Sequence, residues 1–575
     1  MVIVDADSRW RRVGSTDHFT VWTIDPPRRT GFVSGPSEMI IGDLFDREGA
    51  PIQDAAVCSH RDHADAVAHR LSRESWGRYV ALLPTPSGRT SVFRDPSGSL
   101  EAYSWSLSSG LAVVTSTPTR LPTALQPPQL VLNWEKIWRF LAAPAAFGDG
   151  SLFDGVRSIR PGEMAFAGDA ARPGIQIWRP SDFVVNSRPD PGEAEEMVRR
   201  VDMCVAALVS GHDRVLMQLS GGLDSAVVAS ALAASGVSAR VVQWLNRFGD
   251  RPESDERAFA RAVAEHLGVE VTFAERKAIP ITEEGLAELA GSFHPAMAGV
   301  DLSRDRDEAD RLRDTGATAI VSGEGGDAAF FQMPSALVIA DAVRRQGLGV
   351  LAGPLPGQIA RRTRQPVWTV LHSALTALVG TPSPVRLNSP YVTDLPAAAV
   401  LRHPWVEEAR GAKISPGKLL QVTAMSAAHM LPGESRRRQL AEHLYPLFAQ
   451  PVMERCLSIP SPVLAGGSFD RPFARQAFTH RLPRSVRSRR AKGDLSSYYA
   501  RLVARSLPAL RPFLLDGALA EAGVLDRAKL DEALTVEQLI WGASPNQIMW
   551  AAATEAWVRH WQGRTGDSLS APRKS

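Results

Sequence analysis

Residues 215–225 read Val-Leu-Met-Gln-Leu-Ser-Gly-Gly-Leu-Asp-Ser, an apolar run that ends abruptly in small and polar residues. Small residues continue from Ala226 to Ala234, so the pattern predicts a buried strand, a tight turn and the start of a helix. Gly221 and Gly222 allow the backbone to approach an anion closely. The N–H groups and the dipole of a helix N-terminus favour negative charge. The stretch therefore predicts a phosphate-binding loop rather than an ordinary turn.

The polar residues of this loop indicate what it binds. The hydroxyls of Ser220 and Ser225 can donate hydrogen bonds to phosphate oxygens, whereas Asp224 would repel a bare phosphate and so indicates a bridging Mg²⁺. The loop lacks the Gly-Lys-Ser/Thr of the Walker motif. Gln218 also stands where the serine-hydrolase elbow needs its first glycine. The pattern instead matches the SGGxDS loop of enzymes that cleave ATP to AMP and pyrophosphate.

A second informative stretch, Ser322-Gly323-Glu324-Gly325-Gly326-Asp327, follows an apolar run. Its glycines allow a tight loop, and we place Gly323 among the nucleotide-binding residues. Asp327 is the expected second carboxylate on Mg²⁺, because two acids that face a triphosphate require a cation between them. We expect Glu324 on the same ligand-facing edge, where it could hold or deprotonate an amine nucleophile. The competing interpretation is a solvated acidic turn.

Two charged stretches are more ambiguous. Residues 253–256 (ESDE) open a predicted helix, where Ser254 or Asp255 would cap the first turn, and a direct substrate role is the alternative. Residues 489–494 (RRAKGD) place Lys492 beside a glycine, where it could stabilise charge that develops on pyrophosphate. A solvated basic helix end is the other interpretation of that run.

Composition narrows the class of protein. The chain has 575 residues, too many for one ordinary core, and its net charge of +3 gives no general case for nucleic-acid binding. Three cysteines far apart (Cys58, Cys204 and Cys456) give neither a disulfide framework nor a zinc spacing, which fits a reducing cytoplasm. The start of the chain does not read as a signal peptide, and no apolar run is long enough for a membrane span.

The pattern of the chain changes near residue 190. Residues 1–185 read as β-rich, with a short helix at 134–141 and a loop at 151–163, and the polar stretch 186–191 reads as a linker. Residues 192–575 form the second predicted domain, an α/β fold with a doubly wound parallel sheet and a mostly helical part after residue 340. Its predicted strands cover residues 215–219, 239–245, 269–273 and 318–322.

With these motifs in place, the chain resembles the asparagine synthetase family, and most closely the branch of β-lactam synthetases and lasso-peptide cyclases. Residues 76–98 (WGRY…FRDPSG) and 151–163 (SLFDGVRSIRPGE) are similar to the amino-terminal amidotransferase domain, and SGGLDS, ESDE, GEGGD and RRAKGD follow in the order of the synthetase domain. The resemblance implies an Ntn-type αββα sandwich, like a class II glutaminase, before the ATP-pyrophosphatase domain.

Departures from the family pattern indicate the subgroup. Val2 follows Met1, where a working glutaminase of this family needs a nucleophilic cysteine, so the first domain resembles an inactive glutaminase. Residues 327–334 (DAAFFQMP) lack the Glu-Gly-Gly-Tyr elements of asparagine synthetases, which argues against a pocket for free aspartate. Residues 445–451 (YPLFAQP), followed by Glu454 and residues 459–461, resemble lasso-peptide cyclases.

The resemblance implies roles for particular residues. Asp224 and Asp327 would hold Mg²⁺, and Lys492 would stabilise the transition states of adenylation and amide formation. Glu324, Glu434 and Glu442 are candidates for a catalytic or substrate-contacting acid. Five further residues would bind ATP: Ser220, Gly221, Gly222, Ser225 and Gly323. The backbone of Val242 and Trp244 would border adenine.

We therefore expect an ATP-dependent macrolactam synthetase of the lasso-peptide cyclase type. It would adenylate an Asp or Glu side chain of a precursor core peptide and join it to the peptide's N-terminal amine. A β-lactam synthetase and an ammonia-dependent asparagine synthetase are the rival enzymes, and a non-catalytic scaffold that binds ATP or peptide is the rival from another class. A leader peptidase and a leader-binding protein are plausible partners, and neither nucleic acid nor a membrane is expected.

Overall fold

The computed structural model describes residues 10–24, 32–34, 37–53, 63–117, 120–147, 150–185, 192–249, 251–297, 299–380, 389–394, 402–430, 433, 435–490, 495–542 and 544–565. Three sequence predictions lie outside these residues: the linker at 186–191 and the candidate site residues Glu434 and Lys492. Within the described part of the chain, no helix combines the length and the apolar character that crossing a bilayer requires.

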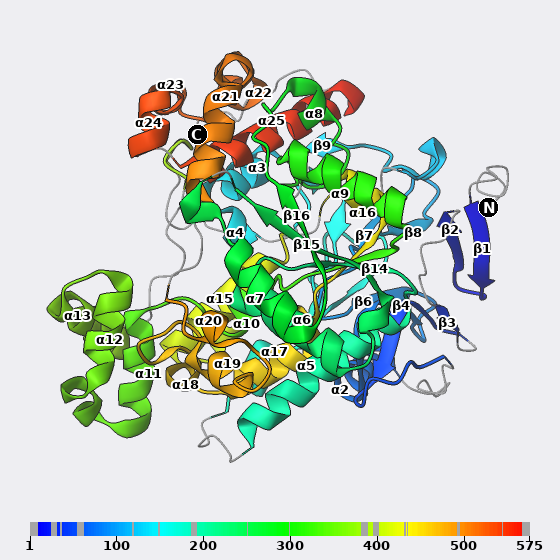
Figure 1. The fold of residues 1–575 in the computed structure, drawn as a ribbon. Coiled ribbons are helices and arrows are strands. Elements are labelled where there is room, and N and C mark those ends of the chain that lie inside the picture. The colour runs from blue at the N-terminus through cyan, green and yellow to red at the C-terminus, as the bar shows by residue number, and fades with distance from the viewer. Residues whose placement is uncertain are drawn as a thin grey trace.

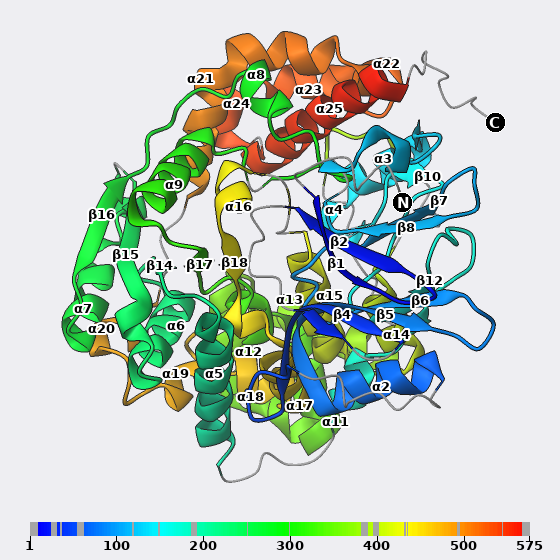
Figure 2. The same cartoon turned by 90° about the vertical axis from the view of Figure 1, so that its right-hand side faces the viewer.

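A five-stranded sheet with the order β16-β15-β14-β17-β18 forms the centre of the later part of the chain, and every neighbouring pair is parallel. Figure 2 shows these strands side by side in that order. The predicted α/β class with a parallel sheet and all four predicted strands are confirmed, whereas β18 was not predicted. The bounds are β14 (Val215–Gln218), β15 (Val241–Phe248), β16 (Val271–Glu275), β17 (Ala319–Val321) and β18 (Glu442–Leu444).

Helices connect these strands, as parallel neighbours require. The helix α7 begins at Arg257 rather than at the predicted Ser254, because a short 3₁₀ turn occupies Pro252–Ser254. It ends at Gly268, whose φ of +68° gives the helix a left-handed C-cap. The helix α5 (Glu193–Ser210) precedes β14. The helices between the strands include α6 (Leu223–Ala234), α7 (Arg257–Leu267), α8 (Glu283–Ala287), α9 (Leu302–Thr315) and α10 (Gly326–Ala329).

The amino-terminal part is β-rich, as predicted, and its strands pair antiparallel. One sheet has the order β13-β12-β6-β5-β4-β3 and a smaller one the order β11-β7-β8. The strand bounds are β1 (Trp10–Ser15), β2 (Thr20–Ile24), β3 (Phe32–Ser34), β4 (Met39–Asp46), β5 (Ser75–Pro84), β6 (Thr90–Arg94), β7 (Tyr103–Ser106), β8 (Ala112–Thr115), β9 (Val131–Leu132), β10 (Phe153–Asp154), β11 (Arg157–Ser158), β12 (Glu163–Phe166) and β13 (Ile175–Gln176).

In this part, the sequence correctly predicted one short helix but missed two short strands. The short helix expected at 134–141 is confirmed as α3, and it is joined by α2 and α4. The expectation of a plain loop at 151–163 was wrong, because β10 and β11 lie within it, each formed by two residues that pair with distant strands. The helix bounds are α2 (Ala64–Glu74), α3 (Trp134–Ala142) and α4 (Pro144–Phe147).

The part after residue 340 is mostly helical, as predicted, with β18 as the exception. In Figure 1, α11 to α13 form a group at one edge of the molecule, and α21 to α25 form another group. The bounds are α11 (Ala336–Gln346), α12 (Pro354–Thr363), α13 (Val367–Val379), α14 (Pro404–Gly411), α15 (Pro416–Ala428), α16 (Arg436–Leu440), α17 (Gln450–Ser458), α18 (Ser461–Ala465), α19 (Pro472–Ala477), α20 (Arg484–Arg487), α21 (Ser496–Leu515), α22 (Ala518–Glu521), α23 (Arg527–Ala533), α24 (Val536–Trp541) and α25 (Pro545–Thr565).

Both large hydrophobic cores contain residues from the two parts of the chain. Trp76 and Trp178 from the amino-terminal part belong to the same buried cluster as Val215 of β14. In the second cluster, the rings of Phe153 and Trp557 have centroids 5.0 Å apart. The antiparallel sheets therefore pack directly against the parallel sheet and the last helix.

Candidate functional site

The turn between β14 and α6 forms a compact loop at the carboxyl edge of the parallel sheet. Gly221 has φ +80°, a left-handed conformation that favours glycine. The hydroxyl of Ser225 accepts from the Ser220 N–H at 3.1 Å, and the two serine Oγ atoms lie 2.9 Å apart. Gly222 is the N-cap of α6 and makes no side-chain cap, so the helix begins without a capping side chain. Anion binding at this helix end stays a prediction.

The acidic loop after β17 packs tightly against this turn, because β17 and β14 are neighbours in the sheet. A Cβ atom on Gly323 would lie 2.5 Å from the backbone nitrogen of Ser225, and one on Gly326 would lie 2.7 Å from Cγ of Asp224. Both distances are shorter than real Cβ contacts. Glycine at 323 and 326 therefore allows the two loops to meet.

The contact between the loops brings Asp224 and Asp327 to a single cation. Nη1 of Arg471 lies 2.5 Å from a carboxylate oxygen of each. Two carboxylates that converge on one positive centre match the oxygen ligands that proteins give Mg²⁺, so these residues fit the ion that the sequence indicates. Bound there, Mg²⁺ would neutralise phosphate charge.

Arg471 was not singled out from the sequence. It precedes α19 with φ +49°, a left-handed conformation uncommon for residues other than glycine. Its side chain is buried, which lowers its pKa, but Asp224 and Asp327 outweigh burial and raise the pKa above its ordinary value. A permanent positive charge thus lies between the two acids.

The neighbouring strand β15 holds the phosphate loop in place. The fully buried amide of Asn246 donates to the Leu219 carbonyl at 2.8 Å, and the Leu219 N–H donates to the Leu245 carbonyl at 2.9 Å. Trp244 belongs to the main hydrophobic core and Val242 packs against a smaller core, so only their backbone remains as the candidate border of adenine. Asn246 is a positioning residue that sequence reasoning missed.

The ESDE and RRAKGD stretches meet at the phosphate loop. Arg489 pairs with Glu256 at 2.6 Å and also donates to the Gly221 carbonyl at 3.4 Å. The expectation that Ser254 or Asp255 caps α7 was wrong, because the N-cap is Glu256 and no side chain caps the helix there, although Asp255 accepts from the Arg257 N–H at 3.0 Å. Lys492 lies three residues after Arg489 and outside the described residues.

Glu324 and Asp327 line different hollows, which corrects the expectation that both face one edge. Asp327 lines a pocket of about 840 Å³ that also reaches Gly222. Glu324 lines a small hollow with Tyr445 and Phe448. Burial, with Glu324 nearby, raises the pKa of Tyr445 to about 12, so its phenol stays protonated at neutral pH.

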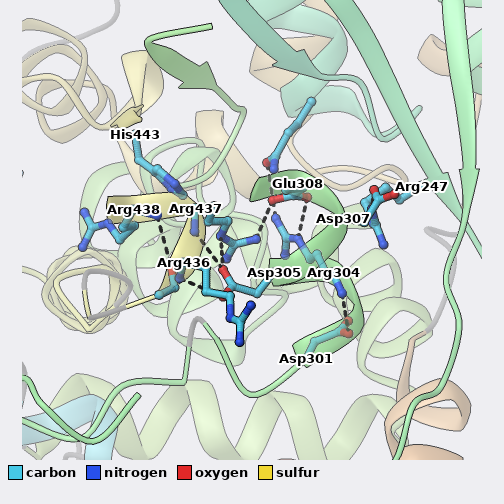
Figure 3. Close-up of polar contacts among 12 residues, drawn as sticks. Arg247, Asp301, Arg304, Asp305, Asp307, Glu308, Arg436, Arg437, Arg438 and His443 are labelled. Carbon is cyan, nitrogen blue, oxygen red and sulfur yellow. Dashed lines mark hydrogen bonds and ion pairs between the residues drawn. The ribbon is translucent and has the colours of Figure 1, made fainter. Parts of the chain in front are cut away.

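A buried ion-pair network joins α9 and α16 (Figure 3). Glu308 on α9 has no exposed side-chain surface and lies 2.6 Å from Arg437 of α16 and 3.0 Å from Arg304. Burial alone would raise the pKa of Glu308, but the two guanidinium groups lower it well below its ordinary range. Asp305 accepts from the Arg436 N–H at 2.8 Å. The network thereby fixes α16, and the start of β18 behind it, against α9.

Glu442 occupies a different position from the other candidate acids. It begins β18 opposite Ala319, the first residue of β17, and so lies at the amino end of the strand. Arg78 of β5 contacts it at 2.6 Å, and this charge lowers the pKa of Glu442 to about 2 although burial opposes the shift. The geometry favours a role in docking the antiparallel sheet, and a catalytic role stays a prediction.

Comparison with protein families identifies the family of the chain. Residues 197–559 match the asparagine synthase family, and the match covers more than half of the chain. The chain therefore belongs to the asparagine synthase family, whose chemistry is ATP-dependent amide-bond formation. No curated protein matches it.

Proposed function

We propose that this chain is a lasso-peptide cyclase, an ATP-dependent macrolactam synthetase that closes a ring in a precursor core peptide. The observation that carries the proposal is the pocket of about 840 Å³, which opens directly beside the phosphate loop and Asp327. That volume suits a segment of peptide, since ligand pockets of about 300–1,000 Å³ accommodate drug-sized molecules. Residues 327–334 lack the Glu-Gly-Gly-Tyr elements of asparagine synthetases, which also favours a peptide over free aspartate as the substrate.

The chemistry follows from the poor reactivity of a carboxylate. An Asp or Glu side-chain oxygen of the peptide attacks the α-phosphorus of ATP, and pyrophosphate leaves. The N-terminal amine then attacks the acyl carbon, loses a proton, and AMP departs with the former carboxylate oxygen. The peptide loses one water overall. Enclosure supplies the proximity of amine and acyl carbon, which contributes strongly to such ring closures.

The residues of the site divide between these steps. Ser220, Ser225 and the amides at the start of α6 would hold the phosphates, and Asp224 with Asp327 would hold Mg²⁺. Lys492 would stabilise both transition states. Glu324, beside Tyr445, is a candidate to position or deprotonate the amine.

The amino-terminal part is proposed to be an inactive glutaminase-like domain of the Ntn type over residues 1–185, followed by a synthetase domain over 192–575. This domain would serve as a scaffold, and the helical region after residue 340 would enclose the peptide. A leader peptidase and a leader-binding protein are proposed partners in the cytoplasm, since a core peptide must first be released from its leader.

Mass spectrometry of two reactions with ATP and Mg²⁺ tests the proposal. One reaction contains a leaderless candidate precursor peptide, with its peptidase if needed, and the other contains aspartate and ammonia. A peptide lighter by one water with equimolar AMP supports a macrolactam synthetase. Asparagine with AMP would instead indicate an asparagine synthetase. A third reaction supplied with a small amino diacid would give a cyclised product if the chain is a β-lactam synthetase.

A variant separates catalysis from scaffolding. Asp224→Ala should abolish the dehydrated peptide and AMP while leaving complexes with maturation partners intact. If maturation of the peptide continues in the variant, the chain acts as a scaffold and the proposal is wrong.

A further inference from the structure

The large pocket extends well beyond the phosphate loop. At one end lie Gly222 and Asp327, and at the other lie Gln358 and Arg361 of α12 together with Arg364 just after it. Figure 1 shows α12 within the helical group at the edge of the molecule, away from the parallel sheet. The α12 end is therefore a separate part of the pocket wall, and neither the phosphate loop nor the acidic loop after β17 contributes to it.

The charges that line the pocket are unbalanced. Seven arginines line it against only two aspartates, Asp327 and Asp470. Asp470 is already paired with Arg471 and Arg475, and Asp327 with Arg471. Among the residues that the structure describes, no carboxylate lies within ion-pair distance of the arginines of the α12 end: Arg361, Arg362 and Arg364.

Arg362 is fixed in place rather than left to move in solvent. Its guanidinium donates to the backbone carbonyls of Ala465 and, at 3.3 Å, Gln332. Burial lowers its pKa, and the positive charges of Arg471 and Arg475 lower it further against the opposing effect of Asp470. An anionic ligand at this end would relieve that repulsion.

Apolar groups also line the same pocket. Met333 and Pro334 line it from the segment after α10, and Ala424 and Ala427 line it from α15. An inorganic anion gains nothing from apolar lining groups, whereas a peptide segment that carries a carboxylate can use both the arginines and the apolar groups. The lining therefore favours a peptide over free pyrophosphate as the occupant.

We propose that the α12 end of this pocket binds a second carboxylate of the peptide substrate, distinct from the carboxylate that is activated. This inference rests on the proposed function, since it requires a peptide substrate. It assigns to Arg361, Arg362 and Arg364 the selection of acidic peptides, and it leaves the phosphate loop to the nucleotide.

Binding of labelled peptides tests the inference without turnover. The probes are fluorescein-labelled, C-terminally amidated peptides of about eight residues that contain either two Asp or two Asn at the same positions. Fluorescence polarisation should show the Asp peptide bound about tenfold more tightly, because charge-assisted hydrogen bonds to arginine are strong. The double variant Arg361→Gln/Arg364→Gln should lose that preference.

The control is Arg306→Gln/Arg344→Gln, which removes the same charge from exposed positions on α9 and α11 outside the pocket. It should retain the wild-type preference. Equal binding of Asp and Asn peptides by the wild-type protein would overturn the inference, as would an unchanged preference in the α12 variant.

A second experiment tests whether the α12 end binds the leaving group, inorganic pyrophosphate with Mg²⁺, rather than a peptide carboxylate. Calorimetry should give the same affinity for pyrophosphate in the wild-type protein and the α12 variant. If the variant instead loses affinity for pyrophosphate and keeps its peptide preference, the α12 end serves the leaving group and the inference is wrong. Failure of the proposed function would appear separately, as an absence of dehydrated peptide from wild-type reactions.

Discussion

Nη1 of Arg471 lies 2.5 Å from a carboxylate oxygen of Asp224, although 247 residues separate the two in sequence. The same nitrogen contacts Asp327 at 2.5 Å. The guanidinium therefore occupies the position between the two acids that a divalent cation needs, and it keeps them together through opposite charge. Mg²⁺ held by these two acids, as proposed, would have to displace the guanidinium from that position.

Replacing Arg471 with Gln should make the stability of the protein respond to Mg²⁺ alone. Without the guanidinium, the two carboxylates repel each other, and breaking a buried ion pair costs about 3–5 kcal/mol. We expect a lower melting temperature that added MgCl₂ partly restores. The control is Arg313→Gln, which removes an arginine from an exposed ion pair with Asp310. Equal Mg²⁺ responses in Arg471→Gln and the wild-type protein would contradict the assignment of the cation position.

Gly326→Ala should weaken ATP binding without unfolding the protein. Its Cβ would lie 2.7 Å from Cγ of Asp224, so the acidic loop must move away from the phosphate loop. We expect the dissociation constant for ATP, measured by calorimetry, to rise about tenfold or more, a loss of about 1.4 kcal/mol. Gly349→Ala is the matched control, because its Cβ would meet nothing within 4 Å. Similar ATP affinities for the two variants would rule out this role for the glycine.

Glu308→Gln tests the network that supports β18. The substitution leaves the guanidinium groups of Arg304 and Arg437 close together and without their shared carboxylate. Loss of one partner from a buried ion pair costs about 3–5 kcal/mol. Urea unfolding should show this loss, whereas Asp310→Asn, in an exposed pair on the same helix, should change the free energy of unfolding by less than about 1 kcal/mol.

Lys418 should give the protein a stability that rises with pH above neutrality. Burial lowers its pKa from 10.5 to about 7, while nearby Cys456 and Asp341 oppose the shift. Between these values the unfolded chain binds the proton that the folded chain lacks. The free energy of unfolding therefore increases with pH, by at most about 1.4 kcal/mol per unit. Below pH 7 both states are protonated and this contribution no longer changes.

The measurement is the difference in urea midpoint between the wild-type protein and Lys418→Met at pH 7, 8 and 9. The wild-type midpoint should gain on the variant as pH rises, and Lys413→Met, at an exposed position, should track the wild type throughout. A constant difference across this range would show that Lys418 keeps its proton in the fold.

The parts of the fold that could be predicted from sequence are those whose patterns are local. Strands β14 to β17 are apolar runs, and Gly268 ends its helix with a conformation that glycine adopts easily. By contrast, β18 has only the residues Glu-His-Leu, and pairing with β17 rather than any propensity makes it a strand. The two-residue strands β10 and β11 were missed for the same reason.

The residues of the candidate site also fall into those that the sequence could indicate and those that it could not. Asp224, Ser225 and Gly323 could be assigned because each lies in a short motif at the end of a buried strand. Arg471 and Asn246 could not, since their partners lie far away in sequence or are backbone groups. The separate directions of Glu324 and Asp327 also depend on how the loop packs, which spacing alone does not specify.

The two shared cores limit how far this chain can be shortened. Trp178 donates to Glu454 at 3.1 Å and packs within the core of the parallel sheet, while Phe153 packs against Trp557 near the end of the chain. Deleting the amino-terminal sheets would expose both cores to water. The family-matched residues 197–559 therefore share their buried cores with the amino-terminal sheets, so the chain cannot be shortened to that range without exposing apolar surface.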